Sequence, residues 1–161
     1  PFVVIGLATG MRRSEIFQIK KEHVNLEGRF ITVPDAKAGQ RMQPITGQLV
    51  DFLRRYMKTL PDDTPWLLPA SSKSGHTMEI KFAFRRVVKA ALLNPDEITP
   101  HNMRHTVITH AVQSGLDLAM VQKISGHKTI QMVLNYAHAN EEHIQAAMDK
   151  LENRLRLPMA G

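Results

Sequence analysis

The chain has 161 residues, a length that fits one domain with a substantial core. Its 43% hydrophobic and 22% charged residues are ordinary for a globular protein, and the absence of cysteine excludes disulfides, cysteine-ligated metals and thiol nucleophiles. The sum of 21 lysines and arginines exceeds that of 15 aspartates and glutamates, and the resulting net charge of +6 favours a polyanionic partner.

Two short helices are predicted before any strand. Residues 2–8 are apolar throughout and predict a buried helix that ends at Gly10. No capping residue and no initiator Met precede this helix, so we expect the chain to be a piece of a longer protein. A second helix is expected from Arg12 to Lys20, with Ile16 and Ile19 facing inward.

A β-hairpin is predicted next. Residues 29–34 and 42–45 are strand-forming runs on either side of a polar turn, and we expect the tip of this hairpin to carry Lys37 and Arg41. An amphipathic helix is expected at 48–60, because its apolar residues recur at helical spacing.

The following segment predicts a loop and then two helices. Residues 61–76 contain three prolines and a serine-rich run, which is typical of a loop. A helix is expected at 78–93. The next helix has Thr99 as its N-cap and Pro100 in its first position, and it is expected to end at Ser114.

The remainder of the chain predicts helix throughout. One helix is expected at 118–125, closed by Gly126, and another at 129–138. A final helix is expected from Asn140, with an apolar stripe at Ile144, Met148, Leu151 and Leu155. The fold class is therefore mainly α with a small antiparallel β-hairpin or sheet.

The helix that opens at Pro100 carries the first candidate site. His101 and Arg104 share a face near its N-terminus, where a guanidinium beside free backbone N–H groups predicts an anion site. His101 and His105 also have the spacing of two metal ligands. Asn102 stands where a zinc protease has glutamate and no third ligand follows, so we expect no metal there and a supporting role for His105.

Two further positions each admit two interpretations. Arg12 follows the helix-ending glycine and has Glu15 three residues on. This pair is either a solvated helix start or a guanidinium that Glu15 holds toward a phosphate. Tyr136, nine residues after His127, is either a core or interface side chain or a hydroxyl at a surface cleft.

Taken in order, these residues resemble the catalytic domain of the tyrosine recombinases, the phage-type integrases. Residues 9–16 are similar to the first sequence box of that family, and residues 100–106 are similar to its second. Lys37 lies 25 residues after Arg12, and His127 lies 23 after Arg104, as the family has them. The resemblance rests on six positions: Arg12, Lys37, His101, Arg104, His127 and Tyr136.

The resemblance implies the fold of that domain and a reversible cleavage of DNA through tyrosine. Tyr136 would attack the scissile phosphate, form a 3′-phosphotyrosyl bond and release a 5′-hydroxyl. His101 would handle the tyrosine proton or support the phosphate, since imidazole titrates near neutrality. Lys37 would protonate the departing 5′-oxygen.

The same resemblance assigns the groups that stabilise the transition state. Arg12 and Arg104 would bind the nonbridging phosphate oxygens, and His127 would add a third donor. Glu15 and His105 would support them. No metal, nucleotide or redox cofactor is implied.

Double-stranded DNA is the implied partner, and assembly as a homo-tetramer on paired sites is implied with it, with accessory DNA-bending proteins as further candidates. Basic residues expected to contact the DNA backbone, although each can equally be a solvated charge, are Arg13, Lys20, Lys21, Arg41, Lys73 and Lys128. Residues 1–140 would form the catalytic domain. The helical tail at 141–161 would pack on its own domain or on a neighbouring protomer. No apolar run is long enough to span a bilayer, and a cytoplasmic location is expected.

Two other functions remain open at this level. A type IB topoisomerase shares the tyrosine chemistry but relaxes supercoils as a monomer. A noncatalytic DNA-binding or assembly module would need neither Tyr136 nor Lys37, so the complete set of six residues favours the recombinase.

Overall fold

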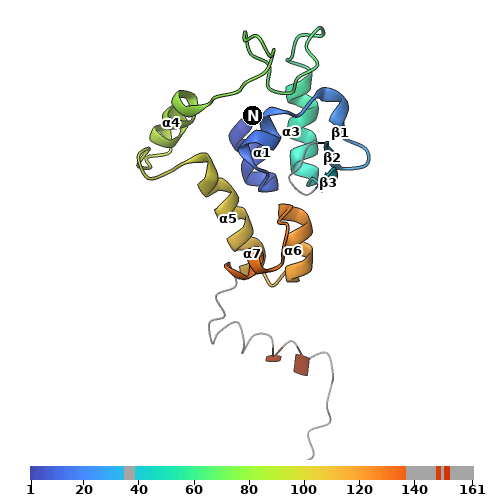
Figure 1. Cartoon of the computed structure of the whole chain (residues 1–161), viewed down its shortest axis with the longest axis vertical. Coiled ribbons are helices and arrows are strands. Elements are labelled where there is room, and N and C mark those ends of the chain that lie inside the picture. The colour runs from blue at the N-terminus through green and yellow to red at the C-terminus, as the bar shows by residue number, and fades with distance from the viewer. Residues whose placement is uncertain (35–38, 137–147, 150, 153–161) are drawn as a thin grey trace, which may run out of the picture.

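The computed structural model describes residues 1–34, 39–136, 148–149 and 151–152. Most of the chain is helical, with one small sheet (Figure 1). The elements follow in the order α1 Phe2–Thr9, α2 Arg13–Phe17, the 3-10 helix η1 Lys21–His23, β1 Val24–Asn25, β2 Phe30–Val33, β3 Arg41–Pro44, α3 Gly47–Met57, α4 Lys81–Ala90, α5 Pro100–Gln113, α6 Leu118–Ser125 and α7 Gln131–Leu134.

The helix ends follow local chemistry where the sequence supplies a cap. α1 ends at Gly10, whose φ of 65° is the left-handed conformation that glycine adopts without strain. The Thr46 hydroxyl accepts a hydrogen bond from the Leu49 amide at the start of α3. Asp117 caps α6 in the same way, and α6 has the bounds that the sequence predicts.

Four helices are shorter than predicted, and one of them is α3, which ends at Met57 rather than at residue 60. α2 ends at Phe17 rather than Lys20, because Lys20 instead forms a β-bridge with Trp66. α4 begins only at Lys81, where the Glu79 carboxylate accepts hydrogen bonds from the first amides. α7 spans four residues, and the predicted end of that helix at His138 lies outside the described residues.

The predicted hairpin is confirmed, with an added strand. β2 and β3 are antiparallel in the register Phe30↔Pro44 to Val33↔Arg41, and β1 pairs with β2 on its other side. The sequence did not reveal β1, because two residues are too few to show alternation. Arg41 is the first residue of β3, opposite Val33, rather than part of the hairpin tip. Lys37 lies outside the described residues.

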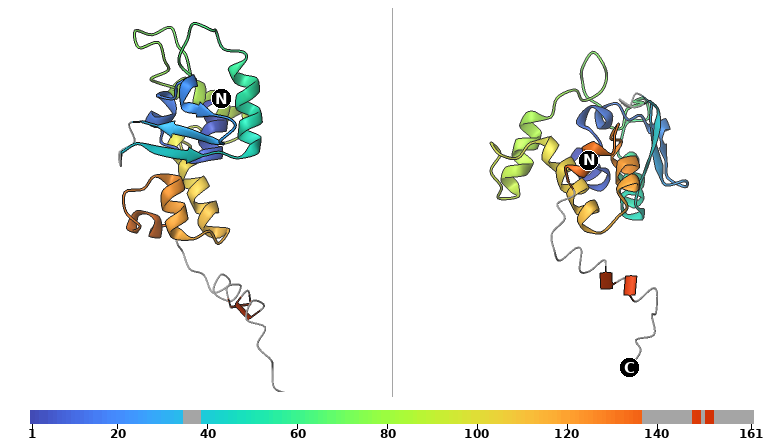
Figure 2. Two further views of the ribbon diagram at one scale, coloured as in Figure 1. Left: turned by 90° about the vertical axis from the view of Figure 1, so that its right-hand side faces the viewer. Right: turned by 60° about the horizontal axis from the view of Figure 1, so that its bottom comes forward.

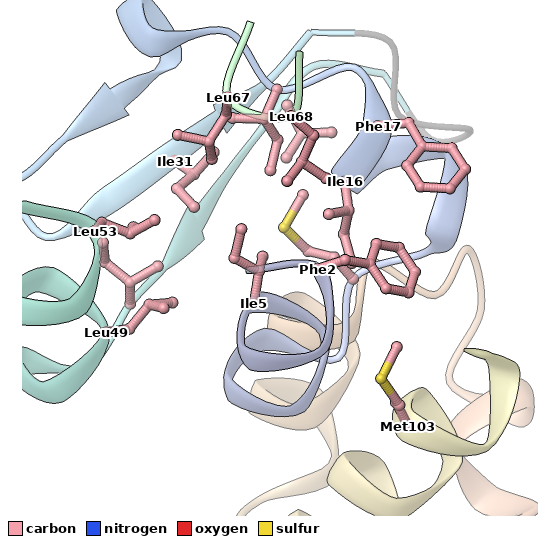
Figure 3. Packing of buried hydrophobic residues seen from close by; sticks show 14 of the residues in the cluster. Phe2, Ile5, Ile16, Phe17, Ile31, Leu49, Leu53, Leu67, Leu68 and Met103 are labelled. Carbon is pink, nitrogen blue, oxygen red and sulfur yellow. The ribbon is translucent and has the colours of Figure 1, made fainter. Parts of the chain in front are cut away.

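The main core lies between the sheet, α3 and α1. Ile5 of α1, Ile31 of β2 and Leu53 of α3 are fully buried and point toward one another (Figure 3). α1 can occupy this central position because it is apolar along most of its circumference. It also packs along α5, and Met103 of α5 belongs to the same cluster.

A second, smaller cluster consists of Ile108, Val121 and Val133 from α5, α6 and α7. Figures 1 and 2 show α6 and α7 beside the C-terminal end of α5, away from the sheet. α5 therefore runs from one cluster into the other, and the residues of its first turns lie at the junction. This is where the candidate site is found.

The predicted tail stripe is described only in part. Met148 and Leu151 are helical and exposed, while Ile144 and Leu155 lie outside the described residues. None of the helices in the described part of the chain is both long and apolar enough to cross a membrane.

Candidate active site

Arg104 connects three parts of the chain. It lies on α5, its side chain is buried, and its Nη1 donates hydrogen bonds to the carbonyl oxygens of Gly10 at 2.8 Å and Ser125 at 2.7 Å. Its Nη2 is also buried but has no hydrogen-bond partner among the described residues. A buried guanidinium N–H without an acceptor is energetically costly, and Arg41 Nε is in the same situation among the described residues.

Arg12 is held by a carboxylate and by a helix end. It is the N-cap of α2, where its Nη1 pairs with Glu15 Oε1 at 3.1 Å and its amide donates to Glu15 Oε2 at 2.8 Å. Its Nη2 donates to the carbonyl of Gly126 at 3.1 Å. Arg12 and Glu15 thus form the helix start that one interpretation expects, but Glu15 is buried rather than solvated.

The two arginines thus bind consecutive carbonyl groups, those of Ser125 and Gly126, at the C-terminal end of α6. The last carbonyls of a helix lack intrahelical donors and carry the negative end of the helix dipole. Burial, with a further contribution from Arg12, lowers the pKa of Arg104 to about 10, so its guanidinium remains charged at neutral pH.

His127 follows directly after this helix end. Gly126 has a φ of 66°, which turns the chain so that the buried His127 ring lies beside the cavity. Its Nδ1 lies 3.0 Å from the Ser125 hydroxyl. Burial, followed by the charges of Arg104 and Arg12, lowers the pKa of His127 to about 4, so the ring is neutral at pH 7.

Tyr136 lines the same cavity. Its ring centroid is 5.4 Å from that of His105 and 6.0 Å from that of His127. Burial raises the pKa of Tyr136, so the phenol is protonated at rest. His101 meets His105 edge-to-face at 4.3 Å, and burial with the neighbouring His105 lowers the pKa of His101.

Two adjoining cavities of about 440 and 400 Å³ share Arg12, His101 and Arg104 in their walls. His127 and Tyr136 line the second cavity. None of the described residues that line either cavity is an aspartate or glutamate. Three arginines, Arg12, Arg13 and Arg104, therefore line a space that suits an anion.

The structure places five of the six sequence-predicted catalytic residues together. Arg12, His101, Arg104, His127 and Tyr136 line the second cavity, as does the supporting residue His105. The sixth, Lys37, lies outside the described residues. Within the described ranges, this site included, no three histidine, aspartate or glutamate side chains gather closely enough to bind a metal ion.

The six expected DNA contacts fall into two groups. Arg13, Lys73 and Lys128 are exposed, and Arg13 also lines the first cavity. The Lys20 ammonium lies over the Trp66 ring and pairs with Glu22. Lys21 Nζ donates to the Pro61 carbonyl at 2.6 Å, so both lysine ammonium groups already have partners within the protein.

Arg41 turns inward. Its Nη2 pairs with Glu15 Oε2 at 3.1 Å, and its Nη1 donates to the buried Gln43 side chain. A Cβ added at Gly126 would lie 2.6 Å from Arg41 Nε, so the guanidinium packs directly on that glycine. The sequence offered no local signal for this contact, because Arg41 and Glu15 are 26 positions apart.

Ser125 is a second residue that the sequence reasoning missed. Its carbonyl accepts from Arg104 and its hydroxyl contacts His127 Nδ1. A signal was available, since a hydroxyl residue at the last position of a helix, two before a candidate catalytic histidine, can reach that ring.

Two arginines, three histidines and one tyrosine thus meet in one cavity at the junction of two helical clusters of a mainly α domain. The sequence pattern of the phage integrase family matches residues 2–143, and the chain belongs to that family. Its fold is that of a tyrosine recombinase catalytic domain, as the resemblance predicted. The catalytic domain of bacteriophage HP1 integrase superposes with a TM-score of 0.67 at 28% identity, covering 99% of this chain and 84% of that one.

Similar proteins include tyrosine recombinases of archaea and bacteria. XerA of Pyrococcus furiosus is 30% identical over 156 residues, covering 94% of this chain and 54% of the relative. XerD of Brucella suis is 34% identical over 144 residues, covering 85% and 47%. The integrase of transposon Tn1549, solved with transposon right end DNA, has a TM-score of 0.76 at 27% identity over 92% of this chain and 57% of that one. The chain spans about half the length of these curated relatives.

Proposed function

We propose that this chain is the catalytic part of a site-specific DNA recombinase that breaks and rejoins DNA strands through Tyr136. The observation that carries the proposal is the cavity that Arg12, Arg104, His127 and Tyr136 line together, with no carboxylate among its described lining residues. A phosphate is the anion whose charge and oxygen acceptors suit such a set of donors.

The cleavage step balances with side chains of this chain alone. The Tyr136 oxygen forms a bond to the scissile phosphorus while the bond from phosphorus to the 5′-oxygen breaks. The phenol proton needs a base, because the pKa of Tyr136 is raised, and His101 can accept it because its lowered pKa keeps the ring neutral. In this scheme Lys37 supplies the proton that the departing 5′-oxygen requires, and reversal of the step rejoins the strand.

Stabilisation of the transition state falls to the donors around the phosphate. The pentacoordinate phosphorus carries extra charge on its nonbridging oxygens, and fixed guanidinium groups stabilise such charge without reorganising. Arg12 and Arg104 are fixed by Glu15 and by the end of α6, so they are already in place before substrate arrives. His127 adds a neutral donor on the same side of the cavity.

The partner in this proposal is double-stranded DNA, and the active assembly is a homo-tetramer on paired sites in the cytoplasm. The net charge of +6 and the exposed Arg13, Lys73 and Lys128 support a polyanionic partner. The Tn1549 integrase, a similar protein, was solved on DNA. In the same proposal, the tail at 141–161 packs either on its own domain or on a neighbouring protomer of the tetramer.

The test is covalent capture from a pool of duplexes. Each duplex has a randomised sequence and one nick, so that the short 5′-hydroxyl fragment released by cleavage diffuses away and rejoining is prevented. We expect wild-type protein to give an adduct on denaturing gels in the presence of EDTA, and sequencing of the captured DNA to reveal a preferred site.

The chain supplies a matched control for the nucleophile. It has two tyrosines, and the Tyr56 hydroxyl donates to the Leu67 carbonyl away from the cavity. Tyr136→Phe is expected to abolish the adduct, whereas Tyr56→Phe should retain it. An adduct that persists in Tyr136→Phe would overturn the proposed function.

A further inference from the structure

Ser125 contacts both a proposed phosphate-binding arginine and a proposed phosphate-binding histidine. It is the last residue of α6 and only 1% exposed. Its carbonyl oxygen accepts from Arg104 Nη1 at 2.7 Å, and its hydroxyl oxygen lies 3.0 Å from His127 Nδ1. The same hydroxyl lies 3.3 Å from the carbonyl oxygen of Gln122. Its single proton can therefore point to only one of two acceptors.

The geometry around Gln122 decides which acceptor the proton takes. The Gln122 carbonyl already accepts from the Gly126 amide at 2.9 Å and from the His127 amide at 3.3 Å. A carbonyl oxygen has two lone pairs, and both are engaged by these donors. The hydroxyl proton is therefore better placed on the shorter contact, to His127 Nδ1, which has no other partner among the described residues.

A hydrogen bond accepted at Nδ1 determines where His127 carries its own proton. A neutral imidazole has one N–H, so Nδ1 as acceptor requires the proton to be on Nε2. The ring lines the cavity beside Arg12, Arg104 and Tyr136, and no protein group within the described ranges bonds to Nε2. The ring is neutral at pH 7 because burial and two nearby arginines lower the pKa of His127.

We infer that Ser125 is a positioning residue that fixes His127 as the Nε2–H tautomer, so that the neutral ring donates a hydrogen bond to an oxygen of the substrate phosphate. The phosphate in this inference rests on the proposed function, whereas the tautomer does not. In the opposite tautomer Nε2 would present a lone pair to an anionic oxygen, and the contact would be repulsive. The nearby arginines oppose the alternative of protonating the ring.

The tautomer can be measured without DNA. Long-range ¹H–¹⁵N correlation spectra at pH 7 distinguish the two neutral tautomers by their ring nitrogen shifts, and the His127 signals are assigned by their loss in His127→Ala. We expect the Nε2–H form in the wild-type protein and a detectable Nδ1–H population in Ser125→Ala. A wild-type His127 that is protonated on Nδ1, or on both nitrogens, overturns the inference.

The functional consequence is measured as single-turnover adduct formation on the captured DNA. Ser125→Ala should slow this step about ten- to a hundredfold, somewhat less than the loss expected when a transition-state donor is removed altogether. Ser125→Thr, which keeps the hydroxyl, should recover most of the rate. Ser114→Ala is the matched control, because Ser114 caps α5 and its exposed hydroxyl donates to the Ala111 carbonyl; its rate should not change.

A double-mutant cycle separates positioning from general damage. If Ser125 acts through His127, then Ser125→Ala has no further effect in a His127→Ala background, and two losses that multiply overturn the inference. If Ser125→Ala fails to fold by thermal melting, the wild-type spectrum alone decides. If wild-type protein forms no adduct on any DNA, the proposed function fails, while the spectra still test the tautomer.

Discussion

In the cavity, Arg104 is charged, whereas His101, His127 and Tyr136 are neutral. Arg104 stays charged although its pKa falls to about 10, while His101 and His127 are kept neutral because burial and neighbouring cationic groups lower their pKa values. Tyr136 keeps its proton because burial raises its pKa. The two guanidinium groups that line the second cavity thus disfavour a further positive charge there, and an arriving phosphate relieves their mutual repulsion.

The free energy of unfolding should fall at acidic pH, because the fold keeps His127 neutral. The unfolded chain binds a proton at His127 below its ordinary pKa of 6.5, whereas the folded chain does so only near 4. The contribution of His127 to the free energy of unfolding is therefore complete above pH 6.5. As the pH falls toward 4, at most about 3 kcal/mol of this contribution is lost. Denaturant unfolding measured from pH 7.5 to 4 is the test.

The variant His127→Gln isolates this effect from other titrations. It lacks the titrating ring, so its unfolding free energy should fall less steeply over that pH window, while the carboxylate contribution is common to both proteins. Parallel curves for wild type and variant would show that His127 is not held neutral by the fold.

Among the elements, the β2–β3 hairpin is joined to the active site through Arg41. This guanidinium pairs with the carboxylate that also holds Arg12, and it packs on Gly126 at the end of α6. The turn end of the hairpin, α2 and α6 are thereby joined to one another around Glu15. We therefore expect Arg41 to act on the geometry of the site rather than on the DNA backbone.

Arg41→Met should lower the unfolding free energy by about 1–3 kcal/mol, because it removes charge-assisted hydrogen bonds from a buried carboxylate and a buried amide. Arg54→Met is the matched control. Arg54 pairs with Asp51 on the surface, and its side chain is 53% exposed against 13% for Arg41, so the change should be within about 0.5 kcal/mol.

The salt dependence of DNA binding separates the two roles of Arg41. A residue that neutralises one phosphate contributes about one to the slope of log affinity against log salt concentration. We expect Arg41→Met to leave that slope unchanged. A slope reduced by about one, with an unchanged melting temperature, would restore Arg41 to the DNA-contacting surface.

The elements that the sequence predicted are those with local signals. Helix boundaries are predicted by the glycine at position 10, by Thr99 with Pro100, and by Asp117 and Gly126. The structure has helix boundaries at all of these places. The contacts of Arg41 with Glu15 and of Arg12 with Gly126 join residues 26 and 114 positions apart. No spacing within a helix or strand encodes such contacts, so they follow only from the packed fold.

At the scale of the whole molecule, the core is divided unequally. In the described part of the chain the main cluster contains seventeen buried apolar residues, whereas the cluster of α5, α6 and α7 contains three. The second cluster is attached through α5 and through the two arginine contacts to the end of α6. Regions with few buried apolar contacts open at lower free energy.

Native-state hydrogen exchange should therefore resolve two levels of opening. We expect amides of α6, such as Val121, to exchange at a lower opening free energy than amides of α1 and α3, such as Ile5 and Leu53. Low denaturant should barely accelerate α6, because a local opening exposes little surface. Equal free energies and equal denaturant slopes in all three helices would instead indicate one cooperative unit.

The contacts at the end of α6 also determine which residue can be lost without losing the fold. Substituting Arg12 or Arg104 leaves carbonyls of Ser125, Gly126 or Gly10 without donors and loosens α6. The Tyr136 hydroxyl has no hydrogen bond to any described residue, so its removal leaves the arginine–carbonyl hydrogen bonds at the end of α6 intact. A lineage that keeps DNA recognition while abandoning catalysis is therefore expected to discard the tyrosine first and to retain both arginines.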